Sequence, residues 1–301
     1  MITYYKRRIG DKKIRRISSI EIGAWINVVD PSQKEIKELC KNLNLDGRSL
    51  LSGLDEHEIP RLDFIDQNTY LFTKDVLPGK KTQTFLIVIG KDFFLTLSKD
   101  KPSFLNKILK ENIELFTTQK LKALIEILFL VNESLEKATE KIVKDVQLKK
   151  LKKTDLSEND LEALLEEEDL LNRLISSYQY IVLVYSRAVK RIEFLNTDKE
   201  LLKDLIEETD QGFYLCRAAL KNISNIRGYY SILLSNRLNK TISILTIFTV
   251  LISIPNLVAG IYGMNINLPF AENPLAFLYI AIFNLIGLIL IIISFKKNNI
   301  I

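Results

Sequence analysis

The sequence predicts an α+β domain, a small sheet flanked by helices, followed by long helices that run into two membrane-spanning helices. Strand-like segments separated by turn signals fill the first hundred residues, and helical periodicity follows almost without interruption. Charged residues make up 26% of the 301 residues, yet residues 241–295 contain one charge, Glu272. We therefore expect residues 1–112 to form the α/β part, 113–240 the long helices and stalk, and 241–295 the membrane part.

The first part alternates apolar segments with turn residues. Ser32 and Glu35 form a capping box, which predicts that a helix begins there. Gly90-Lys91-Asp92 predicts a hairpin turn between two strands. The predicted strands are Trp25–Val29, Tyr70–Thr73, Thr84–Ile89 and Phe93–Leu97.

Three long helices are predicted after Pro102. The first carries an apolar seam at steps of four and three, typical of helix packing: Leu124, Leu128, Val131, Leu135, Ala138 and Ile142. A Lys-rich stretch at Lys149–Thr154 ends it, and a second helix is predicted from Asp160 to Leu195. A third begins near Asp198 and meets no proline before Pro255. It can continue into the membrane as a rod on the order of 100 Å long, which would join the two parts mechanically.

Two uncharged segments are long enough to span a bilayer, which takes about 20 apolar residues. We place them at 241–262 and 275–295, joined by the link 263–274. A buried hairpin in a soluble protein is the alternative, but two such segments in succession disfavour it. The flanks carry Arg237, Lys240, Lys296 and Lys297, whereas the link has no Lys or Arg. The positive-inside rule therefore predicts that both termini, including the basic tail 296–301, are cytoplasmic and that the link is external.

The first span carries a stripe of polar and small residues, whereas the second is almost purely apolar. Steps of three and four place the stripe on one helical face: Asn239, Ser243, Thr246, Thr249, Ser253, Asn256 and Gly260. Polar groups facing lipid are costly, so the stripe should face other helices or water. Ser and Thr can bond their own backbone, which makes Asn256 the most informative member. A water-lined stripe would require a symmetric ring of subunits.

Other function classes lack their signatures. The net charge of +5 gives no argument for nucleic acid, and no nucleotide or hydrolase motif is present. His57, the one histidine, lacks the second His of a zinc motif and is expected at the surface. The acids Glu166–Asp169 are expected to form a solvated helix face. Cys40 and Cys216 are expected to be reduced and buried. We expect neither an enzyme nor a bound cofactor.

The run Gly260-Ile261-Tyr262-Gly263-Met264-Asn265 ends the first span, about 36 residues before the C-terminus. It closely resembles the Gly-Met-Asn signature of CorA-type magnesium transporters. Leu54-Asp55-Glu56 with Pro60-Arg61, and Asn239 with Leu245-Thr246, resemble further parts of that family. The resemblance implies a homopentameric funnel in the cell membrane. It also implies a pore lined at Asn239, Ile242, Leu245, Ser253, Asn256, Gly260 and Asn265.

In that family cations follow their electrochemical gradient, and cytoplasmic Mg²⁺ closes the channel. Two positions depart from its pattern. Gly228 stands where relatives often have a regulatory aspartate, so inhibition should be weaker or use other acids. The link lacks the common Met-Pro-Glu-Leu run, and Glu272 is expected to supply its negative charge.

The predicted function is Mg²⁺ influx, with Asn265 receiving the ion through its bound water. Gly263 is expected to end the helix with backbone angles open only to glycine. The expected partners are other copies of the chain, the lipid bilayer and divalent cations. One alternative is a transporter of Zn²⁺, Ni²⁺ or Co²⁺. The other is a membrane-anchored helical scaffold or sensor without conduction.

Overall fold

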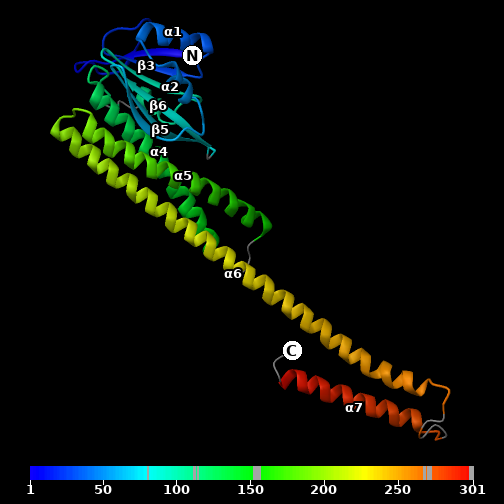
Figure 1. The fold of residues 1–301 in the computed structure, drawn as a ribbon. Helices are drawn as coiled ribbons and strands as arrows, with labels where there is room; N and C mark the ends of the chain where they lie inside the picture. The colour runs from blue at the N-terminus through cyan, green and yellow to red at the C-terminus, as the bar shows by residue number, and fades with distance from the viewer. Residues whose placement is uncertain are drawn as a thin grey trace. The chain divides into compact units, whose positions relative to one another are not determined.

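The structure, a computed structural model, describes residues 1–79, 81–110, 113, 115–151, 157–266, 269 and 273–297. The chain divides into two compact units, Met1–Ile226 and Arg227–Ile301. Helix α6 (Asn196–Tyr262) contributes to both (Figure 1).

The first unit contains a seven-stranded sheet with the order β2-β1-β3-β7-β6-β5-β4. Its strands are β1 (Ile2–Lys6), β2 (Arg15–Ile17), β3 (Ala24–Val29), β4 (Arg61–Ile65), β5 (Asn68–Leu77), β6 (Lys81–Ile89) and β7 (Phe93–Ser98). Neighbours pair antiparallel except β3 and β7, which are parallel. The four predicted strands are confirmed as parts of β3, β5, β6 and β7. The other three strands, β1, β2 and β4, are not among those four.

The predicted turn at Gly90-Lys91-Asp92 is also confirmed, and its glycine is required by a close approach. The Gly90 N–H donates to the Phe93 carbonyl at 3.1 Å, closing the β6–β7 hairpin. A Cβ atom on Gly90 would lie 2.3 Å from the Phe93 ring, so a side chain there would displace that ring.

Helices cover both faces of the sheet (Figure 1). Helices α1 (Gln33–Leu43) and α2 (Gly47–Ser52) enclose one core with the strands. The predicted capping box is confirmed, because Ser32 and Glu35 bond each other's backbone N–H. Helices α4 (Lys120–Leu151) and α5 (Glu158–Arg191) pack on the opposite face, near β4 and β5. The six-residue helix α3 (Leu105–Lys110) precedes them.

Within the first unit, α4, α5 and the start of α6 share a second core. The predicted seam of α4 is buried, apart from Ala138, which is half-buried. Buried polar pairs also cross between helices. Thr139 Oγ1 lies 3.0 Å from Tyr178 Oη and 3.5 Å from Cys216 Sγ. Thr209 Oγ1 lies 3.0 Å from Asn132 Oδ1 of α4 and 2.6 Å from the Leu205 carbonyl of its own helix. Both cysteines are free thiols, with Cys216 buried and Cys40 half-buried.

The expected solvated face at Glu166–Asp169 is wrong at one position. The Glu167 side chain is 2% exposed, and its Oε1 accepts from Lys149 Nζ at 2.7 Å. Lys149 belongs to a stretch predicted as a helix break, but α4 continues to Leu151. The lysine can therefore reach α5 and neutralise the buried carboxylate. Helix α5 also ends at Arg191, short of the predicted Leu195, because Ile192 adopts an extended conformation.

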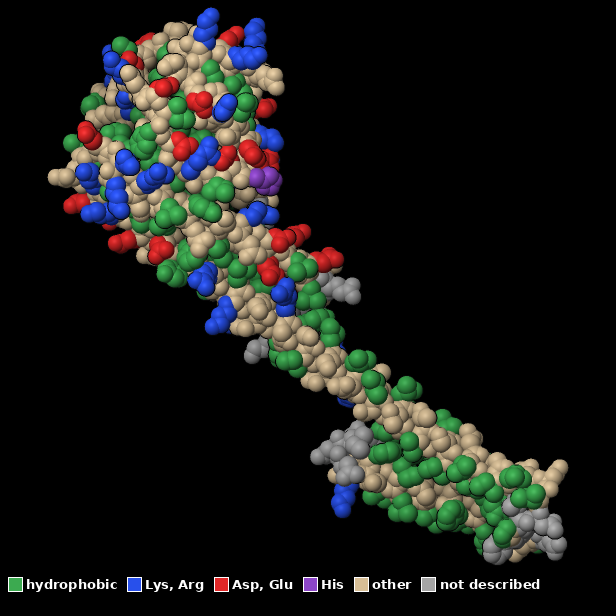
Figure 2. All heavy atoms as spheres, viewed as in Figure 1, with side chains coloured by type: hydrophobic (Ala, Val, Ile, Leu, Met, Phe, Trp, Pro, Cys, Tyr) green, Lys and Arg blue, Asp and Glu red, His purple; other side chains and the backbone are tan. Residues whose placement is uncertain are grey.

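The second unit consists of the end of α6 and helix α7 (Ala276–Lys297), which run side by side (Figure 1). Both contain windows of mean hydropathy above 2 and are long and apolar enough to cross a membrane. Helix α6 ends at Tyr262, where the first span was predicted to end, and α7 begins one residue and ends two residues after the predicted bounds of the second span, 275–295. The predicted continuity of α6 through Pro255 is confirmed. In Figure 2 hydrophobic side chains dominate this unit, whereas charged ones gather over the first unit.

Candidate functional site

The polar stripe lies on a face of α6 that α7 leaves uncovered. The less exposed positions of this segment include Ser243, Ile247, Val250, Ile254 and Val258. At 100° per residue, the centre of this face lies about 100° around the helix from the centre of the stripe. The predicted pore residues of α6 lie outside this less exposed face, and all of them are exposed: Asn239, Ile242, Leu245, Thr246, Thr249, Ser253, Asn256 and Gly260. Ser243 is half-buried and so lies at the edge of the exposed stripe.

The hydroxyl groups of the stripe are used by their own helix. Thr246 donates to the Ile242 carbonyl at 2.8 Å, and Thr249 to the Leu245 carbonyl at 2.9 Å. Ser253 donates to the Thr249 carbonyl at 2.5 Å. Such bonds satisfy the donor without any neighbour. These hydroxyls are therefore weak evidence for a wet surface.

The amide groups behave differently. Asn239 and Asn256 form no side-chain hydrogen bond within the described part of the chain. An amide has two acceptor lone pairs and two donors, all of which need partners at bilayer depth. Next to Asn256, Pro255 has no N–H for the Leu251 carbonyl four residues earlier. The Asn256 amide and the Leu251 carbonyl therefore both lack a partner within α6, about one helical turn apart.

Helix α6 ends at Tyr262, directly before the Gly-Met-Asn motif. The Gly263 N–H donates to the Ala259 carbonyl at 2.9 Å, and the Met264 N–H to the Ile261 carbonyl at 3.2 Å. Met264 and Asn265 are exposed. The expected glycine-only backbone at Gly263 is wrong, because its φ is not positive. Instead the space is tight: a Cβ atom there would lie 3.1 Å from the Ala259 oxygen.

The link after the motif is described in part. Glu272, predicted to supply external charge, lies outside the described residues, as do 298–301 of the predicted basic tail. Asn273 Oδ1 accepts from the Leu275 N–H at 2.9 Å just before α7. Lys296 and Lys297 lie in the last turn of α7.

Sequence reasoning missed one polar residue of α7. Asn284 lies on the half-buried face of this apolar helix, with Ile280, Leu288 and Ile291. Its Nδ2 donates to the Ile280 carbonyl at 3.0 Å. A single Asn in an apolar run is visible in the sequence, but the face that carries it is not.

The described residues of the first unit show no comparable ion site. Among the described residues, no group of three or more His, Cys, Asp or Glu side chains is placed to hold a metal ion. His57 is exposed, as predicted, and its backbone N–H donates to Asp55 Oδ1. Gly228, on α6 at the start of the second unit, faces open space, since a Cβ atom there would meet nothing within 4 Å.

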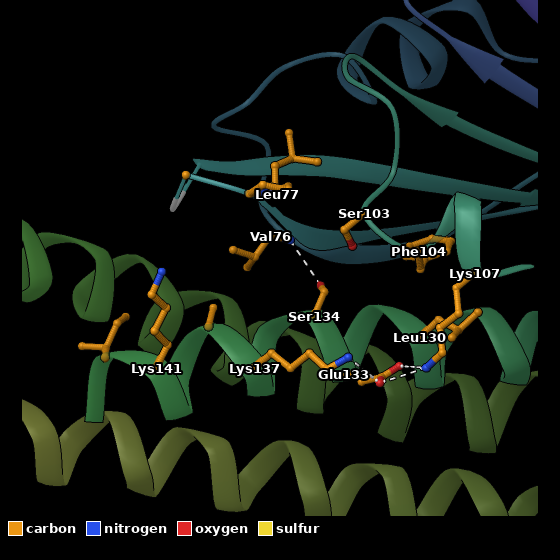
Figure 3. A pocket seen from close by; sticks show the side chains of 14 residues that line it. Val76, Leu77, Ser103, Phe104, Lys107, Leu130, Glu133, Ser134, Lys137 and Lys141 are labelled. Atoms are coloured by element: carbon orange, nitrogen blue, oxygen red, sulfur yellow. Dashed lines mark hydrogen bonds and ion pairs between the residues drawn. The ribbon is translucent and has the colours of Figure 1, made fainter. Parts of the chain in front are cut away.

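A cavity of about 310 Å³ lies between the end of β5, α3 and α4 (Figure 3). Its carboxylate, Glu133, accepts from Lys107 at 2.8 and 2.9 Å and from Lys137 at 2.8 Å. The hydrogen bond from Lys107 contributes most to lowering the pKa of Glu133. Ser134 Oγ donates to the Val131 carbonyl and accepts from the Val76 N–H. These groups stabilise the fold and do not form a nucleophile–base pair.

Comparison with known proteins identifies similar chains over nearly the whole length. The family model of the CorA-like Mg²⁺ transporter protein matches residues 21–297. The cobalt/magnesium transport protein CorA of Methanocaldococcus jannaschii is 24% identical over 295 residues, covering 91% of this chain and 90% of that protein.

Two solved structures share the fold. The complete structure of the CorA magnesium transporter from Methanocaldococcus jannaschii has a TM-score of 0.85 at 20% identity, covering 99% of this chain and 98% of that one. The full-length CmaX protein has a TM-score of 0.72 at 16% identity, covering 94% of each chain.

Proposed function

This chain belongs to the CorA-like Mg²⁺ transporter family, and we propose from that premise that it conducts Mg²⁺ through a pore lined by α6. The observation that carries the pore is the unpartnered amide of Asn256 in the middle of a face that α7 does not cover. In a bilayer that amide needs water, an ion or another chain as its partner. Asn265 is exposed and lies three residues beyond the end of this helix.

One α6 helix cannot enclose a pore, so the proposal requires several copies of the chain around an axis. The resemblance to the family indicates five. The exposed apolar residues beside the stripe support this assembly, because Ile242 is 51% and Leu245 is 65% exposed in the single chain. In a ring these side chains would be covered by neighbouring α6 helices or would narrow the pore.

The chemistry of Asn265 suits a hydrated cation. Mg²⁺ gives up its six waters reluctantly, so a site that binds those waters avoids the cost of removing them. A ring of side-chain carbonyls can accept hydrogen bonds from the bound water. Such outer contacts are weak enough to let the ion leave, which conduction requires. In this proposal Asn265 selects the ion at the mouth of the pore, and Asn256 polarises the middle.

We also propose that both termini are cytoplasmic and that the link is external. The basic residues Arg237, Lys240, Lys296 and Lys297 flank the two spans, and the link has none. A cysteine introduced at Asn273 should react with an impermeant thiol reagent in intact cells, whereas one at Asn298 should not. The reverse labelling would overturn this orientation.

Flux measurement on the full chain in sealed proteoliposomes tests the function. A trapped Mg²⁺-sensitive dye should report influx down an imposed gradient, and empty vesicles give the background. Cobalt should be assayed in parallel, because the name of the archaeal relative includes both cobalt and magnesium. Faster flux of Co²⁺, Ni²⁺ or Zn²⁺ than of Mg²⁺ would change the assigned ion. No flux of any divalent ion from correctly assembled protein would favour the membrane-anchored scaffold.

A further inference from the structure

A second cavity of the first unit, about 360 Å³ in volume, lies between α5, β5, β6 and the loop before β4. Its volume falls within the range of small-ligand sites, about 300–1,000 Å³. Unlike the cavity in Figure 3, it is lined mainly by charged and hydroxyl-bearing side chains. The transport proposal uses none of them.

At the wall of this cavity lies a buried cation, Lys74, which is 7% exposed. Its Nζ donates to the Glu56 carbonyl at 2.7 Å and to Thr84 Oγ1 at 2.9 Å, both neutral acceptors. Burial lowers the pKa of Lys74 to about 8, although Asp55, Glu58 and Glu56 oppose the shift. An ammonium has three donors, so one remains for a ligand. An anion there would compensate a charge that the protein has largely removed from water.

A second cation, Arg173, lines the same cavity from α5. Its exposed guanidinium forms no ion pair or hydrogen bond within the part of the chain that the structure describes. A guanidinium presents a planar fork of donors that matches two oxygens of a phosphate. The hydroxyl groups of Thr82, Ser176 and Tyr180 line the cavity too and can add hydrogen bonds to a ligand.

The acids in the wall are already paired with cations. The Glu56 carboxylate lies 2.9 Å from Lys99 Nζ and 3.2 Å from Lys81 Nζ. These hydrogen bonds lower the pKa of Glu56. Glu58 forms an ion pair with Arg61. The cations left without a directly bonded carboxylate are therefore Lys74 and Arg173.

We infer that this cavity binds a small phosphate-bearing anion, with Arg173 of α5 and Lys74 of β5 holding the phosphate oxygens. The volume exceeds that of a single phosphate, so the ligand class includes phosphate monoesters with a small polar body. This inference does not rest on the transport proposal.

Thermal unfolding of the full chain in detergent tests the site, with inorganic phosphate and glycerol 3-phosphate as the probes. EDTA in every sample prevents effects of divalent ions that phosphate would sequester. Each probe should raise the unfolding midpoint saturably, because a ligand that binds only the folded state stabilises it by mass action. Chloride at equal ionic strength should not. A larger rise with the ester than with phosphate would identify a phosphorylated metabolite as the source, and the opposite order would identify free phosphate.

The decisive variant is Arg173→Gln, which changes an exposed side chain and should leave folding intact. It should weaken the apparent affinity by about tenfold or more, through loss of a charge-assisted bidentate contact. The matched control is Arg187→Gln, an exposed arginine about 21 Å further along α5 and outside this cavity. It should bind as the unmodified chain does. Equal shifts with chloride, or unchanged binding by Arg173→Gln, would overturn the site. Loss of oligomers in Arg173→Gln without loss of phosphate binding would assign Arg173 to a contact between copies instead.

Discussion

In the first half of α6 buried polar side chains contact neighbouring helices, whereas in the second half exposed polar side chains bond only their own helix or nothing within the described residues. Thr209 and Cys216 contact Asn132 and Thr139 of α4. Thr246, Thr249 and Ser253 turn back to their own backbone, and Asn256 has no partner within the described residues. A polar group satisfied inside one chain stabilises that chain. An unsatisfied one indicates a partner that the single chain lacks, and the predictions below separate these two cases.

The largest effect on flux is expected at Asn265, which is exposed and lies three residues beyond the end of α6. Asn265→Ala should reduce Mg²⁺ influx to the level of empty vesicles, because the methyl group cannot accept hydrogen bonds from the ion's water. The fold should be unchanged, since the residue is exposed. Asn265→Asp should still bind cations but alter selectivity or release. Magnesium-dependent growth of a transporter-deficient strain gives the measurement, with oligomer content determined in parallel.

The control for Asn265 is Asn273→Ala in the same link, where the side chain bonds the Leu275 backbone instead. It should retain most of the flux. Full growth with Asn265→Ala would show that the motif is structural and that hydrated-ion selection occurs elsewhere.

The next effect compares an unpartnered amide with a satisfied hydroxyl in the same stripe. Asn256→Leu should lower flux about tenfold, equivalent to about 1.4 kcal/mol on the barrier, because the middle of the pore loses its polar lining. Thr249→Val should change flux little, since that hydroxyl already bonds the Leu245 carbonyl. Stopped-flow uptake into proteoliposomes measures both. Equal flux from the two variants would place Asn256 at a contact between helices.

A regulatory effect is expected at Gly228, just inside the second unit. Inhibition by millimolar internal Mg²⁺ should be weak in the unmodified chain, because glycine provides no ligand. Gly228→Asp should strengthen it, since open space surrounds the position and a carboxylate can be accommodated. Patch recordings with varied internal Mg²⁺ test this. Strong closure that is the same in both proteins would assign regulation to other acids.

The free energy of unfolding should depend more on the hydroxyl groups in the first half of α6 than on those in the second half. Thr209→Val removes a buried hydroxyl that lies 3.0 Å from Asn132 Oδ1 of α4 and 2.6 Å from the Leu205 carbonyl of its own helix. Because the Asn132 amide is buried and loses this polar neighbour, the variant should lose about 1–3 kcal/mol of unfolding free energy. Thr246→Val in the second half should lose less than about 0.5 kcal/mol, because its hydroxyl is exposed and bonds its own helix. Denaturant unfolding of the two variants provides the comparison. A similar loss in both would mean that the second half is also packed through its hydroxyls.

The sequence alone predicted the features that depend on periodicity and charge. The two spans, the uninterrupted α6 and the polar stripe follow from steps of three and four and from the missing charges. Helices α2 and α3 have six residues each, too few for a helical period to show, and β4 is a short edge strand.

Partners between distant segments could not be predicted. The ion pair between Lys149 and Glu167 and the cavity of Lys74 and Arg173 each join elements that are separated in the sequence. The backbone of Gly263 shows a further limit. A glycine at a helix end suggests a left-handed residue, but here φ is not positive, and the position is instead tight against the Ala259 carbonyl.

The smallest effect is expected at Glu136, whose negative charge is unfavourable in the folded first unit. Burial, and then the carboxylates of Glu140, Glu208 and Glu133, raise the pKa of Glu136 above its ordinary 4.5. The folded state therefore binds this proton more tightly than the unfolded state, and stability falls as the pH rises from about 4.5 through the raised pKa.

Glu136→Gln removes that penalty. It should raise the free energy of unfolding at neutral pH by a few tenths of a kcal/mol, because solvent screens a side chain this exposed. The gain should shrink as the pH falls toward 4.5, where the native carboxyl is itself neutral. Thermal unfolding from pH 4.5 to 7.5 measures it, with the exposed Glu193→Gln as the matched control. A loss of stability at neutral pH would mean that the Glu136 charge is stabilised by a cation such as Lys137, whose charge opposes the rise in pKa.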